Sequence, residues 1–153
     1  MRFLLSFLWL FAGITNAEPE TGAVYLEVFK SKSCGCCVKW IEHLHENGFD
    51  AVGTDTESLS SFKHQHGVKP KYQSCHTAIS LGGYVFEGHV PARYISQFLR
   101  NPVEGVIGLS VPGMPFGSPG MEVPKRFDPY TVLLLKNDGS SEVFAAVNSP
   151  YEQ

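Results

Sequence analysis

Three of the chain's four cysteines fall within four residues, in the segment KSKSCGCCVKW between Lys30 and Trp40. Cys34 and Cys37 have the C-x-x-C spacing of a dithiol redox switch. Cys36 forms a C-x-C with Cys34, and its pairing with the adjacent Cys37 would make a poor disulfide but a dense source of thiolate. This spacing suits both electron transfer through sulfur and metal binding, and it does not choose between them.

Two methionines occupy a second segment of soft donor atoms, VPGMPFGSPGME from Val111 to Glu122. Met114 and Met121 each follow Pro-Gly, and apart from the initiator they are the only methionines of the chain. No helix is expected there for them to pack, and the prolines limit where each thioether can point. We therefore interpret both as candidate metal ligands rather than as the flexible core residues that methionines usually are.

The donor atoms together favour one metal. Four thiolates and two thioethers are soft ligands, which select Cu(I) over harder ions. Zinc accepts four cysteines but has little use for methionine, and the cysteine runs usual in iron–sulfur proteins differ from this one. The sequence therefore predicts a copper site, with Cu(I) preferred, built from Cys34, Cys36, Cys37, Cys75, Met114 and Met121.

Two of the six histidines stand near this set in the sequence. His76 adjoins Cys75, and His89 precedes the start of a predicted helix at Pro91. We treat both as candidate copper ligands, with ordinary structural roles as the open alternative. His43 and His64 lie on predicted helix surfaces, so we expect them to be solvated.

The N-terminus, MRFLLSFLWLFAGITNA, has a basic residue, a short apolar run and small residues at its end. This pattern is typical of a secretory signal peptide, cleaved after about Ala17. Residues 18–153 then form a single domain with a net charge of −4, because loss of Arg2 reduces the 12 basic residues to 11 against 15 acidic ones. That charge argues against a nucleic-acid partner, and the lack of a second apolar run argues against a membrane after cleavage.

The elements that must position the cysteines follow from periodicity. A β-branched and aromatic run predicts a strand just before the cysteines. Apolar residues at Cys37, Trp40, Ile41 and Leu44 then predict a helix that ends at Gly48. Cys34 and Cys36 should therefore lie at the helix N-terminus, where the dipole favours thiolate.

The rest of the chain continues as an alternation of strands and helices. In the second helix, with Asp55 or Thr56 as N-cap, we expect Leu59 and Phe62 to face inward. The order β-α-β-α-β-β-α predicts an α/β, thioredoxin-like fold with parallel and antiparallel strands in one sheet. A Pro/Gly-rich loop and a C-terminal hairpin follow. The predicted ranges are 23–29, 49–54, 76–81, 83–87, 130–135 and 142–147 for strands, 37–48, 57–66 and 91–101 for helices, and 102–129 for the loop.

The motifs CGCC, SCHTA, GGYVFEGHVP and VPGMPFGSPGME, in this order, resemble the CopG-type periplasmic copper-resistance proteins, a family long described as a domain of unknown function. The resemblance runs from about Val24 to Val147. It implies a thioredoxin-like fold in the bacterial periplasm, with copper held by cysteines at the first helix start and by the later cysteine. The positions that match are Cys34, Cys36, Cys37, Cys75, His76, His89, Met114 and Met121.

The implied fold adds one expectation about Cys75. Thioredoxin-like oxidoreductases usually place a cis-proline just before the third strand, facing the C-x-x-C. Here that stretch reads YQSCH, so Cys75 is expected across from the CGCC motif, where another sulfur would complete a metal site.

Our leading hypothesis is a periplasmic protein of copper resistance that holds Cu(I), with thiolates bridging more than one ion. It would buffer copper, pass it to an efflux system or another periplasmic carrier, or cycle it between Cu(I) and Cu(II) as a copper-dependent oxidoreductase. The alternative is a thiol–disulfide oxidoreductase in which Cys34 attacks and Cys37 resolves. The family resemblance leaves these roles open.

Overall fold

The computed structural model describes residues 22–153, so the predicted signal peptide at residues 1–17 lies outside the described residues. Within the described part, no helix is long and apolar enough to cross a membrane. The elements are β1 (Val24–Lys30), α1 (Gly35–Glu46), β2 (Phe49–Asp55), α2 (Leu59–Gln65), a 3-10 turn (Pro70–Tyr72), β3 (His76–Ser80), β4 (Val85–Glu87), α3 (Ala92–Arg100), β5 (Val106–Ser110), β6 (Tyr130–Lys136), β7 (Ser141–Val147) and a final 3-10 turn (Pro150–Glu152).

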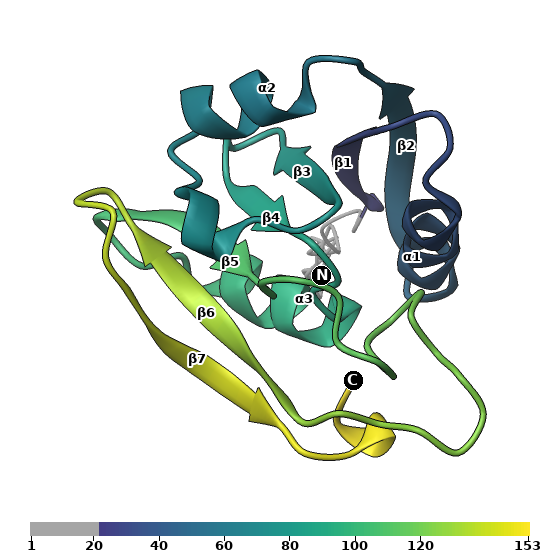
Figure 1. Ribbon diagram of the computed structural model, residues 1–153. Coiled ribbons are helices and arrows are strands. Elements are labelled where there is room, and N and C mark those ends of the chain that lie inside the picture. Colours follow the sequence, from purple (N-terminus) through teal and green to yellow (C-terminus); the bar gives the residue numbers. More distant parts are fainter. Residues whose placement is uncertain (1–21) are drawn as a thin grey trace, which may run out of the picture.

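One seven-stranded sheet runs through the molecule in the order β2-β1-β3-β4-β5-β6-β7 (Figure 1). The pairs β1–β2 and β4–β5 are parallel, and the other pairs are antiparallel. Helix α1 makes the crossover that a parallel β1–β2 pair requires. The predicted α/β class, with both strand directions in one sheet, is therefore confirmed.

The expected loop at residues 102–129 is wrong in part, because it contains strand β5. Its sequence, VIGLS, is apolar and buried, and it pairs with β4 on one side and β6 on the other. A side chain at Gly108 would place a Cβ only 1.8 Å from the carbonyl oxygen of Val85. Thus the glycine counted as a loop signal is the residue that lets β5 approach β4 closely.

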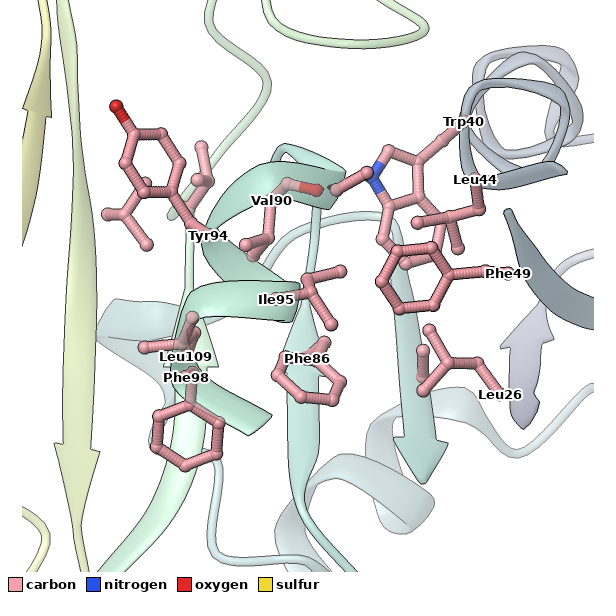
Figure 2. Packing of buried hydrophobic residues seen from close by; sticks show 14 of the residues in the cluster. Leu26, Trp40, Leu44, Phe49, Phe86, Val90, Tyr94, Ile95, Phe98 and Leu109 are labelled. Carbon is pink, nitrogen blue, oxygen red and sulfur yellow. Dashed lines mark hydrogen bonds between the residues drawn. The ribbon is translucent and has the colours of Figure 1, made fainter. Parts of the chain in front are cut away.

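The main core lies where α1 and α3 cover one face of the sheet. Trp40 and Leu44 from α1 pack with Leu26 of β1 and with α3, and the Trp40 indole N–H donates to the carbonyl of Val90 at 2.9 Å (Figure 2). This hydrogen bond satisfies the one polar atom of a fully buried tryptophan. The first turn of α1, which carries the cysteines, is therefore held in place by the core contacts of Trp40, one turn further along the helix.

The opposite face is covered by α2 and the segment that follows it. Phe62 of α2 stacks on Phe29 of β1, with ring centroids 3.9 Å apart. Leu59 and Phe62 are only half-buried, however, and Lys63 is the fully buried residue of the helix. The N-cap position belongs to Ser58 rather than to Asp55 or Thr56.

His43 also departs from expectation. It is half-buried, and its Nε2 accepts a hydrogen bond of 3.0 Å from the N–H of Ala92, the first residue of α3. This contact links α1 to a helix whose N-terminal N–H groups need acceptors. Burial lowers the pKa of His43, although Glu122 and Glu46 nearby oppose the shift. His64, by contrast, is exposed as predicted.

We expect His43 to make stability depend on pH. A histidine with a lowered pKa in the folded state stabilises the fold above the unfolded pKa of about 6.5, and this contribution is lost as the pH falls below it. Between about pH 7.5 and pH 5.5 the free energy of unfolding should fall further in the wild type than in His43→Gln. The difference should be about 0.5–1.5 kcal/mol, the range for one hydrogen bond. Chemical denaturation at both pH values measures it, with His64→Gln as control. Equal pH slopes in wild type and His43→Gln would contradict this role.

Candidate metal centre

The first turn of α1 carries three of the four cysteines. Cys34 occupies the N-cap position, its N–H donates to the carbonyl of Ser31 at 3.1 Å, and it makes no side-chain cap. Cys36 and Cys37 follow in the first helical turn. Cys37 is fully buried, as its place on the apolar stripe predicts, whereas Cys34 and Cys36 are half-buried. The first N–H groups of α1 have no partner within the helix, so the turn that carries the cysteines has a partial positive charge.

The fourth cysteine reaches this turn through the pairing of β1 with β3. The two strands are antiparallel, with Lys30 opposite His76. Cys75, the residue before β3, therefore lies beside the residues that follow β1. Its Sγ is 3.7 Å from the Sγ of Cys36 and 3.5 Å from that of Cys37. The expectation that Cys75 lies across from the CGCC motif is confirmed.

The four sulfur atoms form one compact group. All lie within 4.8 Å of one another, an arrangement that could hold a metal ion. Cys34 and Cys37 are joined as a disulfide, while Cys36 and Cys75 are free. The Sγ of the free Cys36 is also 3.6 Å from that of Cys34, so it lies next to the disulfide as well as next to Cys75. Reduction of the disulfide by two electrons and two protons would make four thiols available.

His89 completes one side of the group with a defined tautomer. Its Nδ1 is 2.8 Å from the carbonyl oxygen of Pro119, which can only accept, so Nδ1 carries the proton. Its Nε2 therefore presents a lone pair toward the Sγ of Cys75, 3.1 Å away. Burial lowers the pKa of His89 and keeps the ring neutral. A neutral imidazole oriented by a hydrogen bond on its other nitrogen is the usual form of a metal-binding histidine.

His76 approaches the same sulfur from the strand side. Its Nδ1 is 3.3 Å from the Sγ of Cys75, and its ring lies 4.3 Å from that of Trp40 between centroids. Burial, with the charges of His89 and Lys63, holds the pKa of His76 well below its ordinary value. Its buried Nε2 has no hydrogen-bond partner among residues 22–153. Cys75, His76 and His89 thus form a second group that could hold a metal ion, sharing Cys75 with the first.

The thiol of Cys75 has an unusual protonation equilibrium. Burial, reinforced by the charge of Cys36, raises the pKa of Cys75 to about 12. Without a metal ion this cysteine therefore stays a thiol despite its neighbours. A soft metal ion would have to displace the thiol proton in order to bind this sulfur.

The segment Val111 to Glu122, which carries both methionines, contacts the chain beside the cysteines at two of its glycines. The N–H of Gly113 donates to the carbonyl of Gln73 at 3.1 Å, and the carbonyl of Gly113 accepts from the hydroxyl of Ser74. Gly120 packs so closely on α1 that a Cβ there would lie 2.6 Å from the carbonyl oxygen of Cys36. Met114 and Met121 each follow one of these glycines. The Met114 side chain is 50% exposed and that of Met121 is half-buried. Their role as ligands stays a prediction.

Sequence reasoning missed the groups that hold the donors in place. The carbonyl of Pro119 orients His89, and the carboxylate of Glu87 accepts the N–H of Ser74 at 2.6 Å. Lys63 pairs with Glu87 in a fully buried ion pair. One signal was available, because Lys63 follows Leu59 by one helical turn and so shares its inward face.

Comparison with known proteins gives a consistent result. The family model described as "Protein of unknown function, DUF411" matches residues 72–121, a range that includes Cys75, His76, His89 and both methionines. No curated protein matches the chain. Two solved structures, described as copper resistance protein copG in form 2 and form 1, are each 38% identical with a TM-score of 0.77. They match over 82% and 83% of this chain and 98% and 99% of their own lengths.

The chain belongs to the CopG family of copper-resistance proteins. The CopG structures are matched over nearly their whole lengths, whereas the DUF411 model matches residues 72–121 and does not include the CGCC segment. The CopG neighbours, together with a cysteine cluster that could bind metal, support a copper-resistance role.

Gly120→Ala should loosen the contact between the methionine segment and α1. Gly120 has φ +84°, and its Cβ would meet the carbonyl of Cys36. Gly113→Ala is the matched control, because Gly113 has φ +70° but nothing within 4 Å of a Cβ. Both variants pay about 1–2 kcal/mol for left-handed backbone, and Gly120→Ala should lose about 1–3 kcal/mol more through overpacking. Urea unfolding measures the difference, and equal losses would show that the segment does not press on the helix.

Proposed function

We propose that this protein is an exported, periplasmic copper-resistance protein that holds Cu(I) on its reduced cysteine cluster. The observation that carries the proposal is the position of the Cys75 sulfur, within 3.7 Å of two other cysteine sulfurs and within 3.3 Å of two imidazole nitrogens. Thiolate and imidazole donors of this kind suit Cu(I). The two methionine thioethers would add further soft donors at the more exposed side.

The arrangement favours more than one copper ion per chain. Cys75 belongs to two donor groups at once, one of sulfurs and one with His76 and His89. A thiolate with neighbours on both sides can bridge two metal ions. Cys36 and Cys37 are adjacent in the chain, which makes a single four-coordinate ion awkward. We therefore infer a multinuclear, thiolate-bridged site.

The role of the site in resistance follows from its chemistry. Partly buried thiolates would limit the access of oxidants to Cu(I), so the protein could buffer copper or deliver it to an efflux system or another periplasmic carrier. The Cys34–Cys37 pair lies inside the cluster, so its redox state would also govern how many thiolates are available. If the bound copper were cycled between Cu(I) and Cu(II), the protein would act as a copper-dependent oxidoreductase.

We expect tight Cu(I) binding by the reduced, metal-free protein in anaerobic competition with bicinchoninate. Cys34→Ser/Cys75→Ser should lose more than the about 100-fold in affinity that removal of an outer partner costs, because two direct thiolate donors are gone. X-ray absorption should count mainly sulfur around copper, with a nitrogen contribution that His89→Gln reduces. His64→Gln, on an exposed position of α2, is the matched control. Absence of tight binding, or unchanged stoichiometry in the double variant, would refute the proposal.

A second candidate function is thiol–disulfide exchange, and the observed Cys34–Cys37 disulfide favours it. Cys34 is the more exposed of the pair and would be the attacking thiol, with the buried Cys37 as the resolving one. The oxidised protein would accept two electrons from a substrate dithiol, forming the substrate disulfide and releasing two thiols at Cys34 and Cys37.

Cys36→Ser separates the two functions, because a dithiol switch does not use Cys36. If the protein is an oxidoreductase, Cys36→Ser that is kept reduced by dithiothreitol should reduce insulin disulfides at close to the wild-type rate, passing two electrons from the reductant through Cys34 and Cys37. If it is a copper protein, Cys36→Ser should bind less Cu(I), and the wild type should show no insulin reduction above a Cys34→Ser control. Insulin turbidity and copper titration on the same preparations give both readouts.

A further inference from the structure

An ion pair without solvent access lies behind the metal centre, on the opposite face of the sheet. Lys63 of α2 and Glu87 at the end of β4 are 3% and 0% exposed. A buried ion pair contributes little net stability compared with apolar residues of similar size. Fold stability alone therefore does not explain why the ion pair is present. The other hydrogen bonds made by Lys63 and Glu87 indicate what it does.

Those hydrogen bonds are directed at the two residues that flank Cys75 and His76. One oxygen of the Glu87 carboxylate accepts the backbone N–H of Ser74 at 2.6 Å. The other accepts the hydroxyl of Thr77 at 2.6 Å. The Lys63 ammonium donates to the first of these oxygens and also to the Thr77 hydroxyl, at 2.9 Å for the latter. One carboxylate thus holds the chain on both sides of two predicted ligands.

The strand geometry explains why Glu87 can do this. Thr77 lies directly opposite Glu87 in the antiparallel β3–β4 pair, so their side chains share a face. Gly88 follows, and its N–H donates to the carbonyl of His76 at 3.0 Å. A Cβ at Gly88 would lie 2.5 Å from the Cβ of Ser74, so the absence of a side chain lets Ser74 come within reach of the carboxylate.

We propose that the Glu87 side chain, placed by Lys63, is a positioning group for the metal centre, which fixes Cys75 and His76 by accepting hydrogen bonds from Ser74 and Thr77. This inference rests on the proposed copper function for its purpose, but the hydrogen bonds of this clamp join protein atoms alone and need no copper. Charge-assisted hydrogen bonds to a fixed carboxylate are short and directional. They hold Cys75 near its partners before metal arrives, so that binding does not have to order this segment.

The test compares two double variants that both remove the ion pair. Lys63→Met/Glu87→Gln keeps a side-chain oxygen that can accept the N–H of Ser74, whereas Lys63→Met/Glu87→Leu has no acceptor. Cu(I) affinity in the Leu variant should fall about 10–100-fold, the usual cost of losing an outer partner of a metal ligand. The Gln variant should retain most of the affinity. The exposed pair Lys136–Glu142, replaced as Lys136→Met/Glu142→Leu, is the matched control and should change nothing.

A metal-free measurement keeps this test independent of the copper proposal. Hydrogen exchange followed by NMR should show a protected Ser74 amide in the wild type and the Gln variant, and a rapidly exchanging one in the Leu variant. If the wild-type protein fails to bind Cu(I), the copper function is refuted while the exchange data still test the clamp. Rapid exchange of the wild-type Ser74 amide, or equal copper affinity in the Gln and Leu variants, would overturn the positioning role. If the Leu variant does not fold, the exchange rate of the Ser74 amide in the wild-type protein still tests the clamp.

Discussion

The antiparallel register of β1 on β3 is the constraint on which the candidate metal centre depends. Because Lys30 lies opposite His76, the last residue before β3 meets the first residues after β1. The chain thereby joins a cysteine-rich helix start to a cysteine far away in the sequence without any long side chain. A shift of the pairing by one residue would turn His76 to the other face of the sheet. It would also withdraw Cys75 from Cys36 and Cys37.

Desolvation sets the chemical character of the site. Burial disfavours the charged forms of Cys75, His76 and His89 alike, so these three groups are neutral donors before a metal ion binds. Neutral imidazoles are ready to bind metal, whereas the thiol must give up its proton. A metal cation that binds here would favour the thiolate over the thiol, because direct bonds to the cation would replace the hydration that the thiolate loses on burial. Within residues 22–153 the buried Nε2 of His76 has no hydrogen-bond partner, which is a cost of burying this ring.

Local patterns in the sequence predicted the parts of the fold that depend on local forces. The apolar spacing from Cys37 to Leu44 placed the cysteines at a helix start, and the structure has α1 begin at Gly35. The donor types also pointed to the group of residues that the structure brings together around Cys75. What the sequence could not show was non-local: the pairing of β5 between two other strands, and the partners of Lys63 and His43. In each case a residue typical of loops or surfaces found its partner on a distant element.

Gly108 illustrates how far the influence of such non-local pairing extends. It has no side chain that could bind a metal ion, and it lies in the middle of β5, close against the backbone of Val85. Yet the segment that leaves β5 carries both methionines and the Pro119 carbonyl that sets the proton position of His89. The pairing of β5 with β4 therefore sets where this segment begins, and the segment in turn supplies the acceptor for His89. A glycine within the sheet, far from any candidate ligand, is thus part of what places the segment that contacts His89.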